Sequence, residues 1–139
     1  MSLLADVSLP VGQAAFTDDY VIPKVLFLAT STLTDRFGLT YNLGPSLVTR
    51  KSNDETRTDV TLNYAVALNG AAGGAVSLFG EVYGALVSGE GLPDRHAFQA
   101  GATVLLTRNL QVDVRGGLGM VDSVPDWLVG AGVAFRLPY

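Results

Sequence analysis

The residues best suited to chemistry in this sequence are charged residues that fall inside strand-like segments. Four are acidic and four are basic, and alternation along the chain places them on one face of the predicted strands: Asp6, Asp59, Glu81, Asp113, Lys24, Arg57, Arg115 and Arg136. Because an unpaired buried charge is costly, opposite charges on an enclosed face are expected to pair. We expect Arg136 to lie near Asp113 and Asp6, and Glu81 to meet Arg115. The set then forms either a salt-bridge network that fills an interior or the lining of a narrow polar path for a solute.

Catalytic and metal chemistry have little support elsewhere in the sequence. His96 is the only histidine, and no serine accompanies it in its strand, although Ser88 lies in the preceding loop. A nucleophile needs a base within hydrogen-bond reach, and one histidine without any cysteine is a poor metal site. We therefore predict that the protein is not an enzyme and uses no cofactor or metal.

The elements that must position the charged side chains are strands. The C-terminal stretch alternates apolar side chains, from Trp127 through Val133 to Tyr139, with side chains that are small or charged apart from Leu128. Such alternation over about a dozen residues indicates a long strand with two different faces. Turn-like clusters divide the rest of the chain in the same way. The predicted strands are Leu3–Leu9, Tyr20–Leu33, Phe37–Leu47, Asp59–Leu68, Ser77–Leu86, Phe98–Leu106, Leu110–Gly119 and Trp127–Tyr139.

The predicted connections alternate between long and short. Polar loops at Arg50–Thr56 and Ser88–Arg95 alternate with short turns at Thr34–Arg36 and Thr107–Asn109. Outer-membrane barrels have long outer loops and short periplasmic turns, so the pattern is typical of them. Pro45 lies inside the third strand, where it predicts a bulge or a weakened ladder because proline has no N–H to donate.

The composition favours a membrane β-protein with a single domain, residues 1–139. Hydrophobic residues make up 48% of the chain and charged residues 16%, against about a quarter charged in soluble domains. Mean hydropathy is +0.33, yet no stretch approaches the roughly 20 apolar residues of a spanning helix. The net charge of -4 and the lack of a basic patch argue against a nucleic-acid partner. The first residues, Met1–Leu4, show no features of a signal peptide, so we expect a mature or engineered form.

The face opposite the charged residues is apolar on every predicted strand. No Asp, Glu, Lys or Arg falls on it, and a charge facing lipid near the midplane would cost about 2–4 kcal/mol. An eight-stranded barrel interior is just wide enough to be filled by side chains. We therefore predict an all-β, eight-stranded antiparallel up-and-down transmembrane β-barrel. A soluble lipocalin-like binder, the other possibility, would place the apolar face inside.

Aromatic residues are predicted near both ends of the barrel. Phe98 and Trp127 fall near one rim and Phe37 and Tyr139 near the other, as in the aromatic girdles of outer-membrane barrels. The expected partners are a lipid bilayer or detergent, and the barrel-assembly machinery through the C-terminal strand. The expected location is the outer membrane.

Five stretches carry the most recognisable motifs: Leu3–Gly12, Leu33–Leu39, Phe79–Tyr83, Thr107–Gly119 and Pro125–Arg136. Together they span nearly the whole chain, and the last two are the most specific. They resemble the outer-membrane family described as putative MetA-pathway of phenol degradation. The resemblance implies a transmembrane β-barrel with a role in uptake of small, often aromatic, compounds. Members are usually longer and usually end in Phe, so this chain resembles a shortened form.

The predicted barrel with a charged interior is compatible with two functions. In the first, the protein is a channel or transporter-like protein for small, including aromatic, molecules, with a narrow, charge-lined lumen. In the second, it is a closed, non-conducting barrel that serves as a structural or engineered membrane scaffold.

Overall fold

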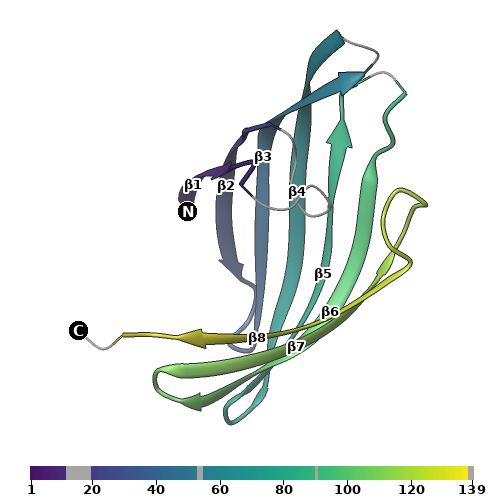
Figure 1. Cartoon of the computed structure of the whole chain (residues 1–139). Helices are drawn as coiled ribbons and strands as arrows, with labels where there is room; N and C mark the ends of the chain where they lie inside the picture. Colours follow the sequence, from purple (N-terminus) through teal and green to yellow (C-terminus); the bar gives the residue numbers. More distant parts are fainter. Residues whose placement is uncertain (12–19, 53–54, 90, 138–139) are drawn as a thin grey trace.

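The computed structural model describes residues 1–11, 20–52, 55–89 and 91–137, and these form an all-β chain (Figure 1). The order of elements agrees with the eight predicted strands. The strands are β1 (Ser2–Ser8), β2 (Ile22–Thr32), β3 (Phe37–Ser52), β4 (Glu55–Gly73), β5 (Val76–Val87), β6 (Arg95–Thr107), β7 (Leu110–Gly119) and β8 (Trp127–Phe135). Among the described residues, no helix is long and apolar enough to cross a membrane.

The strands form one antiparallel up-and-down sheet in which each strand pairs with its neighbours in the sequence. The sheet is curved but open, because β1 pairs only with β2 and β8 only with β7. The predicted closure of the barrel is therefore absent from the described structure. Twist accumulates from strand to strand, and β8 runs at a steep angle to β2 and β3 (Figure 1). The two edge strands consequently do not meet.

Strands β3 and β4 extend further than predicted. Most of the polar segment Arg50–Thr56 is strand rather than loop, and Arg50 pairs with Arg57 across the two strands. Thr49 Oγ1 and Thr58 Oγ1 are hydrogen-bonded at 3.0 Å in the same ladder. Polar residues suggested a loop, but the β-branched side chain of threonine suits a strand. The expected alternation of long and short connections fails at this one place.

The two faces of the sheet differ as the alternation predicted. Large apolar side chains on the convex face are exposed, for example Leu43 at 50%, Val66 at 44% and Val133 at 74%. The concave face carries most of the polar residues and is more occluded along β2, β3 and β4. In the described residues, Ala29 and Ala97 are the only buried hydrophobic side chains. The sheet therefore has no apolar core of its own.

The ladder between β2 and β3 is weakened at Pro45, as predicted. Pairing is present at Lys24 with Ser46 and at Phe27 with Leu43, but not for the two residue pairs between them. The neighbouring Gly44 is buried, and a Cβ there would collide with the carbonyl oxygen of Val25 and lie 2.8 Å from the Cα of Leu26. The close approach of the two backbones therefore requires glycine.

We predict that Gly44→Ala lowers the free energy of unfolding by about 1–3 kcal/mol, the usual cost of overpacking. Gly38→Ala is the matched control on the same face of β3, because a Cβ there would lie 3.6 Å from the carbonyl oxygen of Ser31, an ordinary contact. Urea unfolding in detergent micelles, followed by the fluorescence of the single tryptophan, measures both. Equal stabilities of the two variants would contradict the close backbone approach.

Candidate functional site on the concave face

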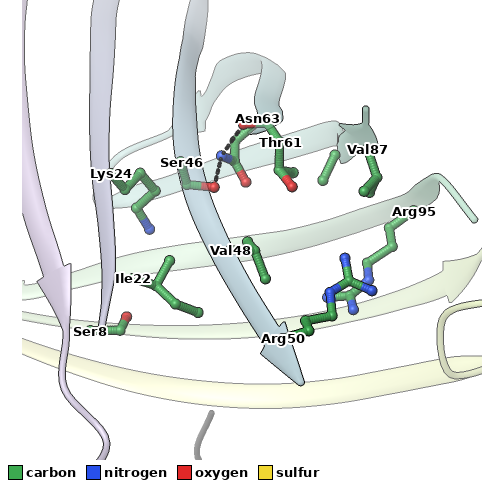
Figure 2. Close-up of a pocket in the computed structure, with 11 residues that line it drawn as sticks. Ser8, Ile22, Lys24, Ser46, Val48, Arg50, Thr61, Asn63, Val87 and Arg95 are labelled. Carbon is green, nitrogen blue, oxygen red and sulfur yellow. Dashed lines mark hydrogen bonds between the residues drawn. The ribbon is translucent and has the colours of Figure 1, made fainter. Parts of the chain in front are cut away.

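A polar recess lies on the concave face, near the end of the sheet where β3 ends and β6 begins (Figure 2). It is a cavity of about 290 Å³ that draws residues from six strands. Its lining residues are Ser8, Ile22, Lys24, Ser46, Val48, Arg50, Thr61, Asn63, Ala85, Val87 and Arg95. Three of these are cationic and none is acidic.

The floor of this cavity is built from buried hydroxyl and amide groups. Ser46 and Thr61 are directly paired across β3 and β4 and are 5% and 6% exposed. The side-chain amide of Asn63 donates to Ser46 Oγ at 2.9 Å and to the carbonyl oxygen of Gly44 at 3.3 Å. These bonds fix the amide orientation and leave a polar surface at the base of the cavity.

The cationic side chains enter the cavity from opposite sides. Lys24 on β2 forms an ion pair with Asp6 on β1 at 3.1 Å. Arg50 and Arg95 extend from the ends of β3 and β6 into the other side of the cavity (Figure 2). Neither arginine has an ion-pair partner among the described residues. Sequence reasoning missed both because it assigned them to loops; continuing the alternation past Leu47 would have placed Arg50 on the concave face.

A second polar recess of about 260 Å³ lies further along the same strands. Glu81 on β5 accepts a hydrogen bond from the side-chain amide of Gln99 on β6. Asn42 also lines this recess, and its Oδ1 is buried without a hydrogen-bond partner in the described structure. Tyr83 adds an aromatic wall. The recess therefore presents an acceptor that a hydrogen-bond donor could satisfy.

The predicted charge network is divided into separate local contacts. Besides Lys24–Asp6, the ion pair between described residues is Arg57–Glu55 at 3.9 Å, which is highly exposed. No ion pair between described residues joins Glu81 to Arg115, or Arg136 to either predicted partner. The open sheet explains the missing contacts of Glu81 with Arg115 and of Arg136 with Asp6, because these required distant strands to face each other across a closed lumen. Asp113 is on the strand next to β8 but pairs with Gly132, whereas Arg136 lies beyond the end of β8.

The remaining predicted charges lie beside glycine or at the ends of strands. A Cβ at Gly132 would lie 3.0 Å from the Cγ of Asp113, and one at Gly130 would lie 2.9 Å from Arg115 Nε. Both charged side chains of β7 therefore lean over β8. The carboxylate of Asp59 lies beside Gly89, and Arg136 lines a small recess at the opposite end of the sheet.

Three of the four aromatic residues predicted to form girdles, Phe37, Phe98 and Trp127, lie on the convex face near strand ends. Phe98, Leu118 and Trp127 follow one another across β6, β7 and β8, and Phe98 and Trp127 are 42% and 67% exposed. Phe37 begins β3 at the opposite end of the sheet, and its ring lies over Gly70. Tyr139 lies outside the described residues.

The family model described as "Putative MetA-pathway of phenol degradation" matches residues 1–137 of the chain. The chain belongs to this family. No curated protein and no solved structure matches it at a significant level. The resemblance found in the sequence is thus confirmed over nearly the full chain.

In this member of the family, His96 lies on the convex face and contacts a tyrosine. Its Nδ1 is 2.8 Å from the hydroxyl of Tyr64, and the two side chains meet over Gly84. Ser88 Oγ donates to the carbonyl oxygen of Val60 at 2.7 Å, so its hydroxyl is engaged with β4. The histidine therefore pairs with a tyrosine across β5 and joins two non-adjacent strands.

We predict that Tyr64→Phe lowers the free energy of unfolding by about 1 kcal/mol, because the His96 nitrogen loses its partner on an apolar face. Tyr41→Phe is the matched control: its hydroxyl is also on the convex face, but lies 3.5 Å from Ser31 Oγ, at the limit of a hydrogen bond. Urea unfolding of both variants in micelles measures the difference. An equal loss in Tyr41→Phe would contradict a specific role for the tyrosine–histidine bond.

Proposed function

We propose that the protein is an integral outer-membrane β-protein whose convex face contacts lipid and whose concave face lines a path for small solutes. The observation that carries this proposal is the exposed apolar convex face of a sheet without a core of its own. Burying one large apolar side chain contributes about 1.5–3 kcal/mol. On β8 alone, Trp127, Val129, Val133 and Phe135 are between 64% and 75% exposed. The hydrocarbon of a bilayer supplies the missing cover.

The distribution of charge supports the same orientation. In the described strands, charged residues lie on the concave face, except for Lys51, which is next to the last residue of β3. A cation at a strand end can reach the polar edge of a bilayer with its long side chain. The family assignment agrees with a membrane-related β-protein.

Insertion requires the two open edges to pair. Unpaired backbone N–H and C=O groups cost several kcal/mol each in hydrocarbon, so spanning sheets are closed. We therefore propose that β1 and β8 pair in the membrane and close an eight-stranded barrel. The alternation suits this pairing, because both strands present apolar residues on the convex side, such as Leu3 and Val7 on β1 and Val129 on β8.

The first test compares unboiled and boiled samples of detergent-folded protein by gel mobility, followed by conductance in a planar bilayer. A closed barrel migrates as a compact, faster band that shifts on boiling, and a channel gives stable openings. Good solubility without detergent, together with no mobility shift, would overturn the membrane assignment and favour a soluble binder with an inverted face.

A closed, non-conducting scaffold is the second candidate, and large side chains on the concave face favour it. Phe79 on β5 extends over Gly101 on β6, where an added Cβ would lie 2.7 Å from its ring. Tyr83 follows on the same face. In a closed eight-stranded barrel, such side chains fill much of the interior. A heat-sensitive compact band without conductance would support the scaffold and reject the channel.

Charge insertion on the two faces gives a direct test of which face contacts lipid. We predict that Val66→Arg lowers the free energy of unfolding in lipid vesicles by about 2–4 kcal/mol, the cost of a lipid-facing arginine at the midplane. Ala67→Arg is the matched control, since Ala67 is on the concave face and paired with Glu81. It should cost much less. A larger loss for Ala67→Arg would show that the face assignment is inverted.

A further inference from the structure

We propose that the cavity bounded by Lys24, Arg50 and Arg95 is a binding site for a small organic carboxylate with an apolar body. This inference deepens the proposed function by assigning a solute class to one end of the concave face. It does not depend on membrane insertion, because binding can be measured with the folded chain in detergent.

The charge of the lining points to an anion. The cavity contains three cations and no acidic residue, in a chain whose net charge is -4. Asp6 compensates Lys24 through the ion pair at 3.1 Å. The two arginines have no ion pair within the described part of the chain, although they line the same cavity. Like charges that share a site repel each other, and an anion between them removes this cost.

The nearby carboxylates do not compensate the charges of Arg50 and Arg95. Asp59 is on the concave face of β4, but its carboxylate lies against Gly89, where an added Cβ would be 2.8 Å from its Cγ. Asp94 Oδ1 accepts a hydrogen bond from the backbone N–H of Val87 at 2.8 Å. Asp59 thus lies against the loop between β5 and β6, and Asp94 is bonded to the end of β5. The guanidinium groups of Arg50 and Arg95 are thus left to an external anion.

The type of donor favours a carboxylate. Guanidinium groups present paired N–H donors that match the two oxygens of a carboxylate, which a compact ammonium group cannot do. The buried hydroxyl groups of Ser46 and Thr61 supply further polar contacts at the base. The site can therefore hold both oxygens of one carboxylate.

The apolar residues of the lining indicate what kind of group the carboxylate is attached to. Ile22, Val48, Ala85 and Val87 are apolar and lie among the polar residues of the cavity. Its volume of about 290 Å³ is just below the usual range for small-molecule sites, roughly 300–1,000 Å³, so the ligand must be small. A compact ring or short chain attached to a carboxylate matches this combination. Inorganic phosphate would leave the apolar walls without contacts.

The test is isothermal titration of the full chain, folded in a nonionic detergent at low salt, with benzoate, benzamide and inorganic phosphate. Benzoate should bind at least tenfold more tightly than benzamide, which has the same ring but no charge, and more tightly than phosphate. Equal affinity for benzoate and benzamide would overturn the anion site. Equal affinity for phosphate and benzoate would overturn the preference for a ligand with an apolar body. No binding of benzoate would reject the whole proposal.

Variants locate the binding to this cavity. Arg50→Gln and Arg95→Gln should each weaken benzoate binding about tenfold. Arg108→Gln is the matched control, since Arg108 is an exposed arginine in the turn between β6 and β7, at the other end of the sheet. An equal loss of benzoate affinity in the control would show that benzoate does not bind in this cavity. Gel mobility of unboiled protein checks the fold of each variant, and the comparison of benzoate with benzamide on the unaltered chain requires no variant.

The outcomes also separate this site from the proposed function. A chain that binds benzoate as expected but neither inserts nor conducts would reject the channel and keep the site. A chain that conducts but does not distinguish benzoate from benzamide would keep the channel and reject the site.

Discussion

The structure depends on one constraint: a single-layer sheet must have its apolar face covered by something other than the chain itself. In the described residues, no large side chain is fully buried, and the buried hydrophobic residues are two alanines, Ala29 and Ala97. A soluble domain is instead built from at least two packed layers that share a core. Here the backbone ladders and cross-strand pairs hold the strands together, while the chain itself leaves the apolar convex face uncovered. Strand length, turn position and side-chain size all serve this arrangement.

Small residues allow the sheet to curve and its strands to approach. At Gly44 two backbones pass too closely for a Cβ, and at Gly84 the absence of a side chain lets Tyr64 and His96 meet across β5. On β8 the concave face has Leu128 at one end and then only glycines and an alanine, so that Asp113 and Arg115 of β7 extend over Gly132 and Gly130. The concave face therefore becomes less crowded towards the β8 edge, where the proposed closure brings β1 alongside.

Much of the fold could be predicted from the sequence because the alternation of side chains is a local property. The strand Leu110–Gly119 was predicted with its observed bounds, and Pro45 marks the weakened ladder because its missing N–H is a property of the residue itself. Closure could not be settled in this way, since it depends on accumulated twist over all the strands. The individual ion pairs also depend on which strands face each other, and so the expected contact of Glu81 with Arg115 does not form.

The cationic cavity was missed for a different reason, which concerns the ends of strands. Arg50 and Arg95 belong to polar segments, and polar composition resembles a loop even where the ladder continues. At such ends the alternation still decides the direction of the side chain, and long charged residues reach back over the concave face. Further along the same face the sign of the charge changes, because Glu81 and its hydrogen bond from Gln99 lie in the next recess. An anion held at the arginine end therefore meets an unfavourable charge deeper in the sheet. Passage through a pore requires that a bound solute can also leave, so in the proposed path the change of sign confines anion binding to the arginine end of the concave face.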